Sequence, residues 1–295
     1  EMTCSINWRQ SVYFMRYSDV LNQSDTILYC AFYGTWYLRF NLGYLLWGYY
    51  AYYSISYDIT WTMSQCIICL RLIGLSWDLY DKRMYAASLK NNKIVINEKF
   101  TSYRLTEIPS FMSVMGYSYF LSSSFAGPQF PYIFYESLIK QINIKNIKEN
   151  YQKCYNYAIQ RIALGFVIMI IVFLFGRIMN DQFFISDTYK EASLVLTGIT
   201  YIKNKETNEI TWDCLKNVDV QNFLLSVNVD DVVQSFNIRT NIWALRYVYT
   251  RLRFLNNKNI SQFVTLLFLA MWHGSHFGYF NAFFLEFLLS LSQKN

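Results

Sequence analysis

The chain has 295 residues and a composition that is unusual for a water-soluble protein. Hydrophobic residues make up 54% of it and charged residues only 16%, against roughly 45–50% and roughly 25% in typical soluble domains. So few charges do not cover the surface of a soluble fold of this size, and disordered, collagen-like and disulfide-scaffold proteins are excluded as well. The net charge of +6 is too diffuse for a nucleic-acid-binding surface. The composition therefore predicts a polytopic membrane protein.

Three apolar stretches in the first half of the chain are candidate membrane spans, for which a helix needs roughly 20 residues. Phe40–Tyr57 is rich in Tyr and Trp, which gather at membrane interfaces. Ile59–Tyr80 is a second candidate span, interrupted by Arg71. Ile108–Tyr135 carries no charge but holds all three prolines of the chain. It predicts a broken or re-entrant helix that is buried among other helices.

Two further candidate spans follow. Tyr155–Met179 is the plainest of all, because its apolar run has no charge between Arg161 and Arg177. Phe263–Leu285 is also free of charge and continues past Glu286, a carboxyl group that either hydrogen-bonds within a helix bundle or lies near the membrane interface. Between the spans, the segment Lys140–Lys153 is basic and helical in pattern, which indicates a solvated helix face.

Cys66 and Cys69 form a C-x-x-C pattern inside the second candidate span. They lie one helical turn apart, and the flanking sequence of a redox or zinc motif is missing. The pattern therefore predicts two buried thiols of the core.

The only two histidines, His273 and His276, lie in the most hydrophobic stretch, LLFLAMWHGSHFGYF. An ionisable side chain at membrane depth is costly and is a candidate functional group. The simpler interpretation is a packed histidine bonded to a nearby carbonyl. Gly274 and Gly278 follow, so the helix can break here or admit a ligand close to its backbone. A catalytic zinc site needs a third protein ligand that the neighbouring sequence does not supply, so no metal site is predicted.

A polar block, SFNIRTNIW (Ser235–Trp243), precedes this stretch and by itself indicates only a capped helix start. However, a longer stretch that begins in this block resembles the signature region of the membrane-bound O-acyltransferases: FNIRTNIWALRYVYTRLRFLNNKNISQFVTLLFLAMWHGSHFGYFNAFFLEFL. It is most similar to the lysophospholipid acyltransferase branch of that family. Two earlier stretches resemble two more blocks of this family, in the same order as in the family: YDITWTMSQCIICLRLIGLSWDLYD and IPSFMSVMGYSYFLSSSFAGPQF. Three collinear blocks are much more specific than a lone W-H-G motif.

The resemblance implies an all-α fold, a polytopic transmembrane bundle with re-entrant or broken helices around a central cavity. Residues 1–295 would form a single, incomplete acyltransferase domain. The implied reaction transfers a fatty acyl chain from acyl-CoA to the free hydroxyl of lysophosphatidylcholine and related lysophospholipids. Such phospholipid remodelling places the chain in the endoplasmic reticulum membrane as a multi-pass protein.

The resemblance carries the family's two active-site roles over to His273 and Asn237. Histidine suits a general base because its pKa lies near operating pH, and burial keeps the ring neutral and able to accept a proton. The amide of Asn237 can polarise the thioester carbonyl or orient the lysolipid hydroxyl. No covalent acyl-enzyme is expected, because direct transfer in a ternary complex is simpler.

Seven neighbouring residues are further expected to contact substrate: Trp243, Arg246, Tyr247, Trp272, Gly274, Gly278 and Tyr279. Arg246 with Tyr247 either holds a phosphate or is a loop-facing arginine at a membrane edge. The expected partners are acyl-CoA as co-substrate, a lysophospholipid and membrane lipids, with a homodimer as an open alternative and no bound cofactor. The segment Lys140–Lys153 could attract the polyanionic coenzyme A, as an alternative to a purely solvated face.

The chain also departs from the family pattern. Spans expected at both ends, and one expected before Asn237, are missing, since Ala192–Tyr201 is too short to cross a bilayer. An inactive truncated family member is therefore one alternative, and an acyltransferase with a sterol or protein acceptor is another. A transporter would need more paired charges along the spans than Arg71, Asp78 and Glu286 provide.

Overall fold

The computed structural model of the chain describes mostly helices. The residues it describes are 39–52, 61–90, 105, 107–120, 123, 129–142, 155–160, 162–163, 166–167, 202–203, 210–211 and 215–294. A short antiparallel ladder of β1 (Ile202–Lys203) and β2 (Ile210–Thr211) is the exception among these residues. The all-α prediction is correct for the helices but misses this ladder, whose Ile and Thr side chains favour extended backbone.

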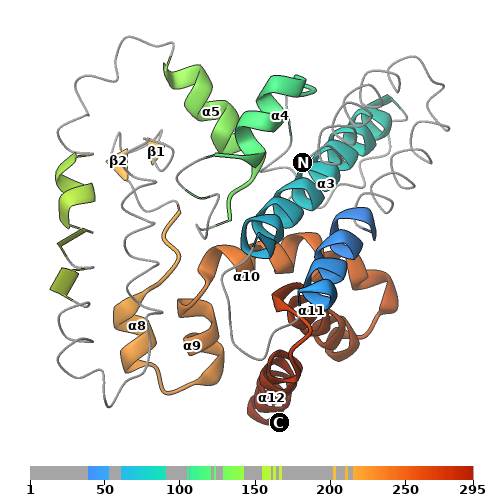
Figure 1. The fold of residues 1–295 in the computed structure, drawn as a ribbon, viewed down its shortest axis with the longest axis vertical. Coiled ribbons are helices and arrows are strands. Elements are labelled where there is room, and N and C mark those ends of the chain that lie inside the picture. The colour runs from blue at the N-terminus through green and yellow to red at the C-terminus, as the bar shows by residue number, and fades with distance from the viewer. Residues whose placement is uncertain are drawn as a thin grey trace.

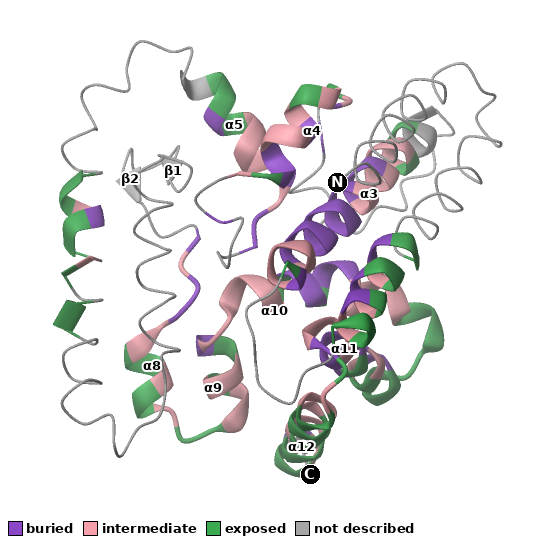
Figure 2. Ribbon diagram, in the orientation of Figure 1, coloured by how far each residue is buried: buried purple, intermediate pink, exposed green. Residues whose placement is uncertain are grey.

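The helix α3 (Thr62–Lys90) is the longest described element, and the helix at residues 39–51, α4, α5, α10 and α11 contribute to its buried clusters. One set of its side chains, with Ile68, Leu72 and Leu75, joins a buried cluster with α4 and α5. A second set, with Leu70 and Ile73, joins another buried cluster with α10 and α11. Figure 2 shows the buried residues concentrated along α3, while α12 is largely exposed. A helix that is apolar on several faces is buried on several faces.

The third candidate span is broken, as its prolines predict. The helix α4 (Phe111–Ser118) begins at Ser110, whose hydroxyl accepts a hydrogen bond from the backbone N–H of Ser113. The next helix, α5 (Tyr132–Ile142), begins directly after Pro131. Proline is favoured at a helix start because the first backbone N–H groups of a helix have no acceptor within the helix. The N–H that proline lacks therefore costs no hydrogen bond there. The prediction of a broken helix is confirmed.

Arg71 of α3 is fully buried and holds this break in place. Its guanidinium donates hydrogen bonds to the backbone carbonyls of Tyr117 and Ser118, at 3.0 and 2.8 Å, and to Ser123. The last carbonyls of a helix lack partners and carry partial negative charge, so a cation at the end of α4 is favourable. Arg71, the charged residue that interrupts the second candidate span, therefore links α3 to the end of α4 by hydrogen bonds.

The C-terminal part is a series of helices, of which α10 and α11 pack against α3 (Figure 1). In chain order they are α8 (Val220–Leu225), α9 (Val229–Ser235), α10 (Ile238–Tyr247), the 3₁₀ helix η3 (Tyr249–Leu255), α11 (Lys258–His273) and α12 (Phe277–Lys294). At the start of α8, the backbone N–H of Asn222 and the Lys216 side chain hold the pKa of the Asp219 carboxyl below its usual range. The cap therefore stays charged at neutral pH.

The last candidate span, Phe263–Leu285, is two helices and not one. The helix α11 ends at His273, and Gly274 follows with φ of 140°, a value that L side chains rarely adopt. The helix break that the sequence predicts at Gly274 is thus present in the structure.

None of the described helices combines the length and the apolar composition needed to cross a membrane by itself. A helix at residues 39–51 covers the larger part of the first candidate span, and residues 53–57 lie outside the described residues. Most of Tyr155–Met179, all of Ala192–Tyr201 and most of Lys140–Lys153 lie outside the described residues.

Candidate active site

A buried cluster of charges joins α10 and η3 to α3. The Tyr247 hydroxyl lies 2.9 Å from both carboxylate oxygens of Asp78 and donates to them, and the Arg246 guanidinium lies 3.5 Å from the same carboxylate. One turn further along α3, Asp81 accepts two hydrogen bonds from Arg251, at 2.8 and 2.7 Å. Arg246 is thus a buried ion-pair partner and not a loop-facing arginine, and its phosphate-binding role stays a prediction.

Trp243 sits in the same contact between α10 and α3. Its indole N–H donates to the carbonyl of Leu70 at 3.1 Å, and its ring stacks on Phe268 with centroids 5.8 Å apart. A Cβ at Gly74 would lie 3.0 Å from the Trp243 indole nitrogen, so glycine allows the two helices to approach closely. In the described structure Trp243, Arg246 and Tyr247 are all engaged with α3, which fixes the position of α10.

We expect Asp78→Ala to destabilise the protein by about 3–5 kcal/mol, because the buried Arg246 would lose its counter-ion. The measurement is thermal unfolding of the detergent-solubilised chain. Glu107→Ala is the control, because Glu107 is exposed. Equal unfolding temperatures of the Asp78 variant and the wild type would show that the ion pair does not anchor α10.

Asn237 occupies an unusual backbone position at the start of α10. Its φ and ψ of 48° and 38° are left-handed, a region in which asparagine is tolerated better than most residues. Its side chain does not cap the helix. Instead its Oδ1 accepts a hydrogen bond from the Nδ2 of Asn217 at 3.4 Å. The Asn237 Nδ2 has no hydrogen-bond partner among the described residues and is left as a donor.

His273 is the last residue of α11 and is half-buried among aromatic rings. Its ring stacks on Tyr279 with centroids 5.3 Å apart and contacts Trp272 and Phe283 at 4.6 and 5.4 Å. Neither ring nitrogen has a hydrogen-bond partner in the described part of the chain. Within the described ranges, the carbonyl partner that the simpler interpretation predicts for His273 is thus not found.

Trp272, one of the residues beside His273, is held by two hydrogen bonds. Trp272 donates to the carbonyl of Cys66 at 2.9 Å, and its own carbonyl accepts from the Tyr49 hydroxyl at 2.9 Å. A Cβ at Gly274 would lie 3.4 Å from the Tyr279 ring, whereas Gly278 has open space around it. Of the residues beside the imidazole, Trp272 is thus tied by its ring to α3 and by its backbone carbonyl to the helix at residues 39–51.

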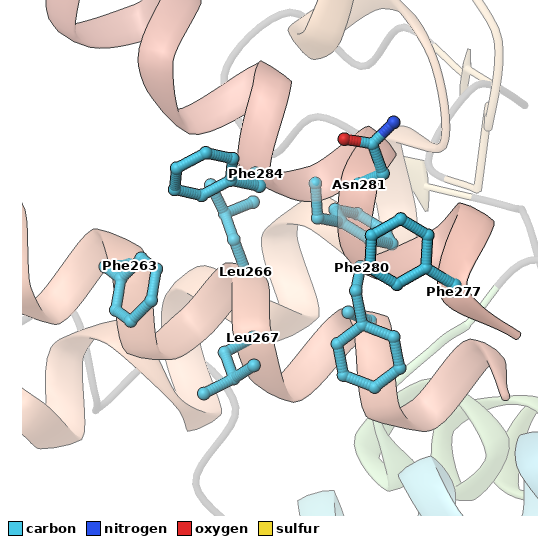
Figure 3. Close-up of a pocket in the computed structure, with 9 residues that line it drawn as sticks. Phe263, Leu266, Leu267, Phe277, Phe280, Asn281 and Phe284 are labelled. Carbon is cyan, nitrogen blue, oxygen red and sulfur yellow. The ribbon is translucent and has the colours of Figure 1, made fainter. Parts of the chain in front are cut away.

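An apolar groove of about 250 Å³ runs between α11 and α12 (Figure 3). Its lining is Phe263, Leu266, Leu267, Ala270, Phe277, Phe280, Asn281, Phe283 and Phe284. Phe283 both lines the groove and contacts His273, and Ala270 lies one turn before that histidine. The Phe283 ring therefore lies between the groove and the imidazole, which does not itself line the groove, and all but one of the lining residues suit a hydrocarbon ligand.

The structure does not join the two predicted active-site residues directly. No hydrogen bond or ring contact connects Asn237 with His273 within the described ranges. Their assignment to one active site stays a prediction. Glu286 is half-buried on α12 and has no hydrogen-bond partner among the described residues.

The two neighbouring cysteines are free thiols of the α3 core. Cys69 is fully buried, and the half-buried Cys66 contacts the carbonyl of Met63. The prediction of buried core thiols is confirmed for Cys69, whereas Cys66 is half-buried and packs against the same cluster. Within the described ranges, no group of three His, Cys, Asp or Glu side chains is arranged to hold a metal ion.

Comparison with known proteins identifies the class. The membrane-bound O-acyltransferase family matches residues 45–179 and 167–294. The chain is 32% identical to lysophospholipid acyltransferase 5 of Rattus norvegicus over 87% of its own length, and 31% identical to that of Homo sapiens over 86%. It is 26% identical to a lysophospholipid acyltransferase of Schizosaccharomyces pombe over 79% of its length.

The chain therefore belongs to the membrane-bound O-acyltransferase family. The matched part of these relatives is limited, because the chain spans 57% of the rat and human proteins and 51% of the yeast protein.

Proposed function

We propose that the chain is a lysophospholipid O-acyltransferase of the endoplasmic reticulum membrane, with one membrane-embedded catalytic domain that remodels phospholipids. Acyl-CoA is the donor, and lysophosphatidylcholine or a related lysophospholipid is the acceptor. The main support is the similarity to lysophospholipid acyltransferases along most of the chain. The structural feature that suits this chemistry is the half-buried imidazole, whose ring contacts Phe283 of the apolar groove.

In the proposed reaction His273 is the general base. It takes the proton of the lysophospholipid hydroxyl as that oxygen attacks the thioester carbonyl carbon. The carbon–sulfur bond then breaks, and the coenzyme A thiolate leaves and takes up the proton held by His273. Asn237 supports the step by donating a hydrogen bond where negative charge develops. Acyl transfer by this route needs neither a metal nor a covalent acyl-enzyme.

The groove between α11 and α12 is the proposed binding site of the fatty acyl chain, since it is apolar and its lining residue Phe283 contacts His273. We expect Leu267→Trp to fill part of it and to lower transfer of a long polyunsaturated acyl chain about tenfold, with little effect on butyryl transfer. The measurement compares turnover with the two acyl-CoA donors. Leu289→Trp is the control, because Leu289 lies on α12 but does not line the groove. Equal losses with both donors would contradict this location.

A panel of acceptors tests the proposed acceptor class. Microsomes that contain the chain are supplied with labelled acyl-CoA and, in separate reactions, lysophosphatidylcholine, lysophosphatidylethanolamine, cholesterol or a serine-containing peptide. Labelled phospholipid is the expected product. Labelled sterol ester or acyl-peptide as the main product would replace the proposal with the sterol or protein acceptor.

A further inference from the structure

Asn217 is a buried asparagine with 4% of its surface exposed, and it lies immediately beside Asn237. Its backbone carbonyl accepts from the N–H of Ile238 at 2.9 Å, and its side-chain Oδ1 accepts from the N–H of Arg239 at 3.1 Å. Its Nδ2 donates to the Oδ1 of Asn237 at 3.4 Å. One side chain thus contacts both the first turn of α10 and the side chain of Asn237.

The direction of these bonds fixes the orientation of both carboxamides. A backbone N–H can only donate, so the Asn217 atom that faces the Arg239 N–H has to be oxygen. The other end of the Asn217 carboxamide is then its NH₂ group. Because that group donates, the Asn237 atom facing it has to be an acceptor. The Nδ2 of Asn237 is consequently turned away from Asn217.

The backbone around Asn237 is held as firmly as its side chain. Asn241 donates from its Nδ2 to the carbonyls of Val233 and Phe236, at 2.7 and 2.8 Å, across the turn that precedes α10. A left-handed residue that is not glycine persists only where its surroundings hold it, and such residues gather at functional sites. The hydrogen bonds of this turn thus fix the backbone from which the Asn237 side chain extends.

We propose that Asn217 is a positioning residue, which orients the Asn237 carboxamide so that its Nδ2 is offered to substrate as a hydrogen-bond donor. This inference rests on the proposed acyltransferase function. It assigns Asn237 to the thioester carbonyl oxygen, which gains negative charge during the attack and is stabilised by a donor. The lysolipid hydroxyl is the poorer partner, since a bond donated to its oxygen would withdraw electron density from the nucleophile.

The variant Asn217→Asp tests this inference. The aspartate keeps an oxygen for the Arg239 N–H but replaces the donor to Asn237 by a second oxygen. The Asn237 carboxamide is then expected to turn its NH₂ inward and present its oxygen to substrate. We expect kcat to fall about 100-fold, with KM for acyl-CoA and for lysophosphatidylcholine nearly unchanged. The control is Asn256→Asp, the same change at an exposed left-handed asparagine, with wild-type kinetics expected.

A double-mutant cycle separates positioning from a general structural role. Asn237→Gly keeps the left-handed backbone at no steric cost and removes the carboxamide. If Asn217 acts through Asn237, adding Asn217→Asp to Asn237→Gly lowers kcat no further. Losses that multiply, or full activity of Asn217→Asp alone, would overturn the inference. Should Asn217→Asp fold poorly, Asn217→Ala removes the same donor without adding charge, and the same cycle decides.

The outcomes also distinguish this inference from the proposed function. An active wild type that loses activity with Asn237→Gly but not with Asn217→Asp overturns the positioning role alone. A wild type whose activity is unaffected by Asn237→Gly overturns the role of Asn237 and, with it, that of Asn217.

Discussion

Replacing His273 by glutamine should reduce acyl transfer to lysophosphatidylcholine by a factor of about 10²–10⁴, the usual contribution of a positioned general base. Glutamine fills a similar volume and keeps polar atoms but does not take up a proton near neutral pH. The planar ring of His273 contacts the rings of Tyr279 and Phe283, and the planar carboxamide of glutamine preserves part of these contacts. The measurement is kcat in microsomes at saturating acyl-CoA, corrected for the amount of protein in the membrane.

His276→Gln is the matched control, because it makes the same chemical change three residues further on. The ring of His276 touches Tyr279 edge-on, with centroids 6.4 Å apart, and we assign it no role in the reaction. We expect kcat to stay close to that of the wild type. Equal activity of the His273 and His276 variants would remove His273 as the base.

Asn237→Asp is expected to reduce kcat about 10²–10³-fold, the effect of losing one donor to a developing oxyanion. Aspartate has nearly the same shape, also tolerates left-handed backbone and still accepts the bond from Asn217. What it lacks is the NH₂ group on the other side. A carboxylate placed near the thioester also repels the charge that the reaction creates there. The measurement is kcat and KM for both substrates in the same microsomal assay.

Asn241→Asp is the comparison for this loss. Asn241 uses its NH₂ group to hold the turn before α10, so its replacement should lower thermal stability as well as activity. Asn237→Asp should lower activity at unchanged stability. An Asn237→Asp variant with wild-type kcat would show that the amide donor takes no part in catalysis.

The sequence predicts the breaks in the helices well, because the signal for a break is local. The prolines in Ile108–Tyr135 and Gly274 after His273 act on their own backbone, and both stretches are broken where the structure describes them. The family resemblance was likewise carried by contiguous blocks, and it is confirmed by the match along the chain.

The contacts that position α10 were not predictable in the same way. Asp78 and Tyr247 are 169 positions apart, and Arg71 caps a helix that begins 40 positions later, so no periodic pattern links the partners. A charge in an apolar stretch marked Arg71 and Asp78 as unusual, but only the fold identifies their partners. No sequence pattern marks Asn217 as a functional residue, because it lies in a polar segment without periodicity. Only the turn before α10 brings it beside Asn237.

The most direct test of the account is acyl transfer by the 295-residue chain itself. The chain is expressed in cells stripped of endogenous lysophospholipid acyltransferases, and their microsomes receive labelled polyunsaturated acyl-CoA and lysophosphatidylcholine. We expect labelled phosphatidylcholine from the wild-type chain and almost none from His273→Gln. No product from the wild type, with the protein present in the membrane, would contradict the account and favour an inactive member of the family.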